Sequence, residues 1–132
     1  MIESSFGTIL RRLREARGLS LREVGQLSGF DHAYVHRLET GEKESPSEDA
    51  VAQIVRALRP SKRQERVLRF LIGRDVAPDL LDPAIIDDPD IDLDDFESAA
   101  QMSFRGKKPS GPAEWRSAID KIRKLRKEFE GG

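Results

Sequence analysis

Apolar side chains recur every three or four positions along most of the chain, and strict alternation of apolar and polar residues is nearly absent. This spacing places the apolar side chains on one face of an α-helix, whereas a half-buried strand needs a period of two. The sequence also contains no Asn-Gly pair, which is a frequent hairpin turn. We therefore predict an all-α fold.

Five amphipathic helices are predicted in residues 1–73, each bounded by residues that favour helix ends. They run over 5–17, 20–29, 31–41, 45–60 and 61–73. The second and fifth begin with capping boxes, in which a serine is followed three residues later by Glu or Gln. These pairs are Ser20 with Glu23 and Ser61 with Gln64. Pro46 suits the first position of the fourth helix.

The second and third helices are joined by a short turn that contains Gly29, and Asp31 can cap the third helix. Two helices joined by so short a turn form a helix-turn-helix. The apolar residues expected to face the core of this domain are Phe6, Ile9, Leu10, Leu13, Leu21, Val24, Leu27, Val35, Leu38, Val51, Ile54, Val55, Leu58, Val67, Leu68, Leu71 and Ile72.

The composition changes over residues 74–93 to Asp and Pro with scattered Leu and Ile. We interpret this stretch as an acidic linker with short apolar anchors, and plain disorder is the alternative. A further helix is predicted from about Asp94 to Ser103. Gly and Pro together then break any helical period over 103–111, so we expect an exposed basic loop there.

The last predicted helix starts near Pro112 and is strongly amphipathic. Its apolar stripe consists of Trp115, Ala118, Ile119, Ile122, Leu125 and Phe129, and its other face is rich in Arg and Lys. One such helix cannot bury this stripe alone. It must pack on the preceding helix, on the first domain or on a second chain.

The length of 132 residues, with 37% hydrophobic and 36% charged side chains, allows one ordinary core or a small core with a helical appendage. A large multidomain enzyme is excluded. The lack of cysteine excludes disulfides, thiolate nucleophiles and sulfur-based zinc sites. The chain shows neither a signal-peptide pattern nor an apolar run near the roughly 20 residues of a membrane span. We therefore expect a soluble, cytoplasmic protein.

Charge is strongly segregated, although the formal net charge is only −1. Residues 1–74 carry +4, residues 75–97 carry −10 without a single Lys or Arg, and residues 98–132 carry +5. Binding to nucleic acid depends on the local field of one face of a protein. The near-neutral total therefore does not exclude a DNA partner.

Residues 19–31, with the sequence LSLREVGQLSGFD, together with Glu39 and Gly41, resemble the Cro/cI-type (XRE) helix-turn-helix family. The resemblance covers roughly residues 5–72. It implies a five-helix domain that binds double-stranded DNA, with the third helix in the major groove. It also implies that Arg14 and Glu39 form a structural pair between the first helix and the end of the third.

The resemblance implies that His32, Ala33, Tyr34, His36 and Arg37 face the DNA, and we predict Arg22 and Lys43 as further DNA-binding residues. Arg37 can donate two hydrogen bonds to guanine O6 and N7, worth about 1 to 3 kcal/mol of discrimination, and Ala33 can touch a thymine methyl group. Arg22 can meet a phosphate beside the free N–H groups at its helix end. Tyr34 is expected near the DNA backbone.

Two departures from the family pattern weaken the expected phosphate contacts. Family members often place Gln at the position of Leu21. Basic residues often follow the recognition helix, where this chain has Lys43 between Glu42 and Glu44. The operator sequence and the affinity therefore cannot be taken over from the family.

His32 and His36 are four positions apart on one predicted helix, which is also the spacing of a two-histidine metal site. We reject that interpretation, because the sequence places no convincing third ligand nearby and Asp31 serves better as a helix cap. We predict no metal, no cofactor and no enzymatic activity.

The order of residues 103–109, with the sequence SFRGKKP, followed by Trp115 and the apolar stripe, resembles the tail of DdrO-type repressors. This resemblance covers about residues 76–130. It implies a small helical dimerisation domain over 94–132 and inactivation by a zinc metalloprotease of the IrrE type, in a stress or defence response. The bond expected to be cut lies between Phe104 and Arg105 or beside it. The residues expected to form the dimer contact are Trp115, Ile119, Ile122, Leu125 and Phe129.

The residues themselves agree with cleavage in this region, because the stretch over 103–111 has little helical order for a protease to disrupt. An ordinary hinge or an extra phosphate contact is the alternative. A dimer would gain effective concentration for its second half-site, so loss of the last helix would weaken DNA binding by orders of magnitude.

These observations predict a dimeric, sequence-specific DNA-binding transcriptional repressor that a partner metalloprotease inactivates. The alternative is an antitoxin of a toxin-antitoxin module, in which DNA binding would be autoregulatory. A self-cleaving repressor with a Ser-Lys protease domain is rejected, because the roughly 60 residues after the fifth helix are helical and too few for that β-rich domain.

Overall fold

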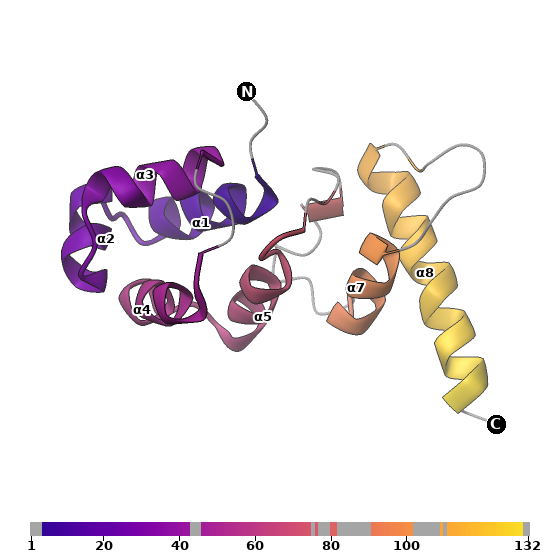
Figure 1. Ribbon diagram of the computed structural model, residues 1–132. Helices are drawn as coiled ribbons and strands as arrows, with labels where there is room; N and C mark the ends of the chain where they lie inside the picture. Colours follow the sequence, from indigo (N-terminus) through magenta and orange to yellow (C-terminus); the bar gives the residue numbers. More distant parts are fainter. Residues whose placement is uncertain are drawn as a thin grey trace. The chain divides into compact units, whose positions relative to one another are not determined.

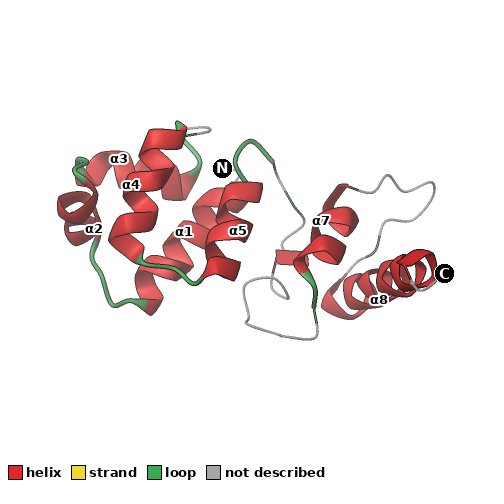
Figure 2. Cartoon of the chain, turned by 90° about the horizontal axis from the view of Figure 1, so that it is seen from below, coloured by secondary structure: helices red, strands yellow, loops and turns green. Residues whose placement is uncertain are grey.

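The computed structural model describes residues 4–42, 46–74, 76, 80–81, 91–101, 109 and 111–130, and every regular element in these ranges is a helix (Figures 1 and 2). The predicted all-α fold is confirmed. The chain divides into two compact units, Met1–Asp75 and Val76–Gly132. No helix among the described residues has the length and apolar character needed to cross a membrane.

The helices of the first unit are α1 (Ser5–Ala16), α2 (Leu21–Ser28), α3 (His32–Thr40), α4 (Glu48–Leu58) and α5 (Lys62–Phe70), and those of the second are α7 (Leu93–Gln101) and α8 (Gly111–Glu130). Each helix predicted from the hydrophobic pattern is present, and the differences concern a few residues at the helix ends. Such differences arise because caps and last turns decide where a helix begins and ends.

Both predicted capping boxes are present. The Ser20 side chain accepts a hydrogen bond from the backbone N–H of Glu23 at 3.1 Å, and the Glu23 carboxylate accepts one from the N–H of Ser20 at 3.0 Å. Ser61 and Gln64 form the same two bonds at the start of α5, at 3.1 and 2.9 Å. These bonds join residues three positions apart, so local sequence alone starts both helices.

The core of the first unit lies between α1, α2, α3, α4 and α5. α3 packs against α1 and α2, and α2 packs also against α4. In Figure 1, α3 runs along one side of the unit, while α4 and α5 lie along the other. The buried apolar residues of this core are Phe6, Ile9, Leu10, Leu13, Val24, Val35, Leu38, Ala50, Val51, Ile54, Leu58, Val67, Leu68, Phe70 and Leu71.

The prediction that Leu27 faces the core is wrong, because its side chain is 58% exposed. A residue three positions along a helix lies 60° short of a full turn, so a stripe read only as i, i+3, i+6 drifts off the buried face. The buried face of α2 is instead formed by Val24, Gly25 and Ser28. A Cβ on Gly25 would lie 2.6 Å from the carbonyl oxygen of Phe30, so only glycine allows this close packing.

The fourth helix starts later than predicted, and Pro46 lies outside it. Ser47 is the N-cap, with its side-chain oxygen accepting a hydrogen bond from the N–H of Ala50 at 3.1 Å, and α4 begins at Glu48. Pro46 is a buried, non-helical residue just before the cap. The hydroxyl group that can satisfy a free N–H therefore decides the start of this helix.

The fifth helix ends earlier than predicted, at Phe70 instead of just before Gly73. The N–H of Ile72 donates a hydrogen bond to the carbonyl of Arg69, and the N–H of Arg74 donates one to the carbonyl of Leu71. The chain therefore leaves the helix through tight turns. The bend leaves Ile72 half-buried and places Phe70, which was not among the predicted core residues, inside the core.

α1 and α3 approach each other closely at Gly7. A Cβ at this position would lie 2.4 Å from the carbonyl oxygen of Glu39 and 2.5 Å from that of Leu38. Because these are backbone atoms, they could not move without displacing the end of α3. Glycine is therefore the only residue type that permits the observed distance between the two helices at position 7.

The second unit is built around the packing of α7 against α8. Phe96 and Ala99 of α7 are each 1% exposed, and Trp115 and Ile119 of α8 are each 2% exposed. Leu80, Leu81, Ile91 and Leu93, which fall within the segment interpreted as a linker, are also buried. These apolar anchors belong to the part of the chain that clusters as the second unit.

A buried ion pair joins the two helices of this unit. Asp95 of α7 is 1% exposed and accepts two hydrogen bonds from the Arg126 guanidinium of α8, at 2.9 and 3.2 Å. Asp92 lies 3.6 Å from the same guanidinium. The two acidic residues neutralise Arg126 beside the apolar contact, and so determine which side of α8 faces α7.

The apolar stripe of α8 is buried in one part and exposed in another. Trp115 and Ile119, which were assigned to a dimer contact, are buried within the chain itself, because α7 supplies an apolar surface for them. Leu125 and Phe129 remain 56% and 87% exposed, and Ile122 is half-buried. Only this second part of the stripe is available for a contact with another chain.

Candidate nucleic-acid interface

The exposed face of α3 carries most of the residues assigned to DNA. His32, Ala33, His36 and Arg37 are all exposed and lie on one side of the helix, because their spacing is i, i+1, i+4 and i+5. Val35, Leu38 and Glu39 occupy the opposite, buried side. The structure thus brings four of the predicted residues together on one solvent-facing surface.

The start of α3 is held by short-range contacts. The Asp31 carboxylate accepts a hydrogen bond from the N–H of Ala33 at 2.8 Å, as expected for a helix cap, and lies 3.3 Å from Nδ1 of His32. The Tyr34 ring packs on that of Phe30, with 4.9 Å between the ring centroids and 43° between the planes. Tyr34 is therefore half-buried, with its ring leaning on the turn that precedes α3.

Arg22 lies in the first turn of α2 and is exposed. The capping box of this helix uses the N–H groups of Ser20 and Glu23. The N–H groups of Leu21 and Arg22 lie in the first turn, where no carbonyl of the helix can reach them. A helix N-terminus with such N–H groups and a neighbouring guanidinium favours the binding of a phosphate. Lys43 lies outside the described residues.

The orientation of α3 relative to α1 depends on an ion pair between Arg14 and Glu39. The guanidinium donates to the two carboxylate oxygens at 2.6 and 3.1 Å, and donates a third hydrogen bond to the carbonyl of Leu19 at 2.9 Å. The side chains are only 15% and 4% exposed. The predicted structural pair is therefore present, and it joins α1, the end of α3 and the loop before α2.

This ion pair shifts the pKa of Arg14. The hydrogen bonds that Arg14 donates to Glu39 raise the pKa of the Arg14 guanidinium above its usual value, against a smaller opposing effect of burial. The pair with Glu39 therefore favours the charged form of Arg14. A bidentate pair between charged groups also restricts both side chains in direction, which suits a contact that positions a helix.

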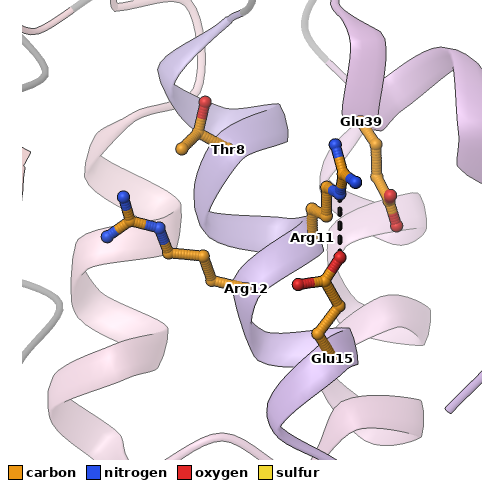
Figure 3. Close-up of a pocket in the computed structure, with 5 residues that line it drawn as sticks. All are labelled: Thr8, Arg11, Arg12, Glu15 and Glu39. Atoms are coloured by element: carbon orange, nitrogen blue, oxygen red, sulfur yellow. Dashed lines mark hydrogen bonds and ion pairs between the residues drawn. The ribbon is translucent and has the colours of Figure 1, made fainter. Parts of the chain in front are cut away.

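A pocket of about 250 Å³ lies beside this ion pair, lined by Thr8, Arg11, Arg12, Glu15 and Glu39 (Figure 3). The Arg11 guanidinium is bonded to the Glu15 carboxylate at 2.9 Å within it. Cations and carboxylates therefore balance each other in the pocket, and none of its residues belongs to the exposed face of α3. We assign it no ligand.

Positive charge is distributed unexpectedly in the first unit. Residues 20–44, which include the helix-turn-helix, hold three Lys or Arg residues and five Asp or Glu residues. Residues 56–69, at the end of α4 and along α5, hold six Lys or Arg residues and one acidic residue. The total charge of the whole domain averages over this contrast, which appears only in shorter segments of the sequence.

His32 and His36 have the spacing of a two-histidine metal site. Among the described residues, no three His, Cys, Asp or Glu side chains are grouped closely enough to hold a metal ion. Asp31, the nearest carboxylate in the sequence, accepts the hydrogen bond that caps α3. The two histidines are part of the exposed face described above.

Comparison with known families supports this geometry. Residues 5–68 match a family model described as a helix-turn-helix domain. The first unit is therefore similar to a helix-turn-helix domain in both sequence and helix arrangement. The match supports a DNA-binding transcription regulator, and it ends before the second unit, for which the resemblance to DdrO-type repressors stays a prediction. No curated protein gives a significant match to the chain.

We predict that Glu39→Gln lowers the free energy of unfolding of the helix-turn-helix domain by about 1 to 3 kcal/mol, because it leaves the mostly buried Arg14 without its charged partner. Glu15→Gln is the matched control, since it breaks an exposed pair and should change stability by less than about 1 kcal/mol. Urea unfolding followed by circular dichroism measures both variants.

The second unit provides an internal reference for this comparison. Trp115 is the only tryptophan of the chain and is buried in that unit, so its fluorescence reports the unfolding of the second unit alone. The fluorescence transition should not change in either variant. Equal losses of stability for the two variants would contradict the role assigned to the Arg14–Glu39 pair.

Proposed function

We propose that the protein is a dimeric, sequence-specific transcriptional repressor, in which α3 enters the major groove of its operator. The observation that carries this proposal is the exposed face of α3, with His32, Ala33, His36 and Arg37 on one side of a helix whose other side is anchored through Glu39. A recognition helix needs both features, a free polar face and a rigid attachment to the domain.

Each residue of that face has a defined role in the proposal. Arg37 donates to the O6 and N7 atoms of a guanine, and Ala33 contacts a thymine methyl group. His32 and His36 face the groove, while Tyr34 lies near the sugar-phosphate backbone. Arg22 binds a phosphate at the end of α2, and Lys43 provides a further cation after α3.

Dimer formation is proposed to occur through the exposed part of α8. Phe129 and Leu125 together present an apolar surface in residues 123–130 of α8, where all the other side chains are charged. The helix-turn-helix segment over 20–44 is rich in acidic residues, so one domain alone would gain little from phosphate contacts. A second half-site, held at high effective concentration by the dimer, supplies the missing affinity.

Inactivation is proposed to occur by a single cut at Phe104–Arg105 or a neighbouring bond, made by a zinc metalloprotease of the IrrE type. Both residues lie outside the described part of the chain. The cut would separate α8 from α7, and α8 supplies Trp115 and Ile119 to the core of the second unit. Loss of α8 would therefore remove the dimer contact and also disrupt the core of the second unit. Without the dimer, repression would end.

An antitoxin is the second candidate, because the same exposed Leu125 and Phe129 would also suit a toxin. The two functions differ in a simple property. A repressor of the proposed kind forms its dimer as a purified chain, whereas an antitoxin that uses this surface for a toxin leaves it uncovered until the toxin is added.

We predict that Arg37→Ala weakens operator binding at least about 30-fold, because the lost contact occurs in both half-sites. Operators are first selected from a pool of random duplexes with the unaltered protein, and affinities are then compared by gel shift. Arg11→Ala, which removes an exposed arginine of α1, should leave the affinity within about threefold. Unchanged binding by the Arg37 variant would refute its placement at the DNA.

Leu125→Asp combined with Phe129→Asp is predicted to raise the dimer dissociation constant at least about 100-fold, because charged groups replace the exposed apolar contact. Lys124→Asp with Lys127→Asp places the same residues on the opposite, exposed face and should leave the dimer intact. Sedimentation velocity measures the oligomeric state. A dimer that persists in the first variant would place dimerisation elsewhere.

Incubation of the full chain with a zinc metalloprotease bearing an H-E-x-x-H motif, encoded by a neighbouring gene, is predicted to give one cut at Phe104–Arg105 or an adjacent bond. Mass spectrometry of the products locates the cut. The same protease with its motif glutamate replaced by glutamine serves as the control. An uncut chain, or a cut within the helix-turn-helix domain, would argue against this mode of inactivation.

A further inference from the structure

The uncovered stripe of α8 has the spacing of a coiled-coil seam. It consists of Ala118, Ile122, Leu125 and Phe129, which follow one another at intervals of four, three and four residues. These intervals correspond to successive d and a positions of a heptad, with Ile122 and Phe129 at a and Ala118 and Leu125 at d. Leu125 and Phe129 are exposed, and Ala118 and Ile122 are half-buried.

α7 leaves this stripe open because it covers only one side of α8. α7 has nine residues, whereas α8 has twenty. Trp115 and Ile119 are buried in this unit, and Arg126 bonds to Asp95 of α7. At about 100° per residue these three positions lie on one flank of the stripe.

The other flank of the stripe carries two opposite charges. Lys121 and Glu128 both occupy g positions of the same heptad pattern, and both are exposed. They are seven residues apart, so they lie on the same side of α8, two turns from each other. A partner helix that packs on the stripe would have its own flank next to these two side chains.

The sizes of the four apolar side chains favour an antiparallel partner of the same sequence. In a parallel pair, Ala118 would face Ala118 and leave a gap, while Phe129 would face Phe129 and crowd the end of the seam. In an antiparallel pair centred between Ile122 and Leu125, each Phe129 faces an Ala118, and each Ile122 faces a Leu125. Large side chains then fill the space beside small ones, as close packing requires.

The charges favour the same direction. In an antiparallel pair, g positions of the two helices adjoin each other, so Lys121 of one chain lies beside Glu128 of the other, twice per dimer. In a parallel pair, g positions adjoin e positions, which would bring Lys121 beside Arg126 of the other chain. Arg126 is moreover already bound to Asp95 and Asp92 of its own chain.

We infer that α8 binds a second copy of α8 in antiparallel orientation across a two-fold axis between Ile122 and Leu125, with two Lys121–Glu128 ion pairs between the chains. This inference rests on the proposed dimer and adds its geometry and its specificity. The ion pairs determine the direction of the partner helix, because like charges would meet in the reverse direction.

Charge reversal tests the direction. Lys121→Glu and Glu128→Lys should each raise the dimer dissociation constant about tenfold, since each places like charges together twice per dimer. The variant with both changes restores the opposite pairs and should return to within about threefold of the unaltered chain. Lys124→Glu is the matched control, because it makes the same change on the face away from the seam and should have no effect.

The reverse pattern would overturn the inference. In a parallel dimer, Lys121→Glu places a carboxylate beside Arg126 of the other chain and tightens the dimer. Failure of the double variant to recover would also overturn it. A chain that is monomeric without any substitution would refute the proposed dimer itself, so the two failures are distinguishable by sedimentation of the unaltered protein.

Cysteine cross-linking gives an independent readout, since the chain contains no cysteine of its own. Ala118→Cys combined with Phe129→Cys should form disulfides between chains under mild oxidation, because the two positions face each other in the antiparallel pair. Phe129→Cys alone should not, because the two copies would lie about 16 Å apart along the helix axis. Cross-linking through Phe129→Cys alone would show a parallel pair instead.

Discussion

The contact between Arg14 and Glu39, together with the close approach of Gly7 to the end of α3, is the constraint on which the first unit depends. Glu39 lies on the buried side of α3, opposite the face that carries Arg37. The ion pair and the glycine fix the position and rotation of α3 relative to α1. The direction in which the exposed side chains point therefore follows from a contact that touches no DNA.

The second unit uses one helix for two purposes. The first part of α8 completes a core with α7 through Trp115 and Ile119, and the second part extends beyond α7 with Leu125 and Phe129 exposed. α7 reaches Arg126 through Asp95 but covers only one flank of α8, which leaves Leu125 on an uncovered side of the helix. Because both parts belong to one continuous helix, any event that removes α8 destroys the core and the exposed surface together.

The distribution of charge bears on the proposed function. The helix-turn-helix segment itself is acidic, while the cations of the first unit lie mainly along residues 56–69. In the proposed repressor, base contacts on α3 would supply discrimination, but general attraction to phosphates would be weak there. Its affinity would then depend on the pairing of two domains, so a change of oligomeric state would regulate DNA binding.

The sequence by itself determined the helices, the two capping boxes, the turn at Gly29 and the Arg14–Glu39 pair, because these features depend on contacts a few residues apart or on a recognisable motif. Tertiary structure decided the rest. Leu27 is exposed because Gly25 and Ser28 let α2 pack through a different face. Trp115 and Leu125 share one apolar stripe, yet only the first is buried, because periodicity shows which side of a helix is apolar but not which part of that side its neighbour covers.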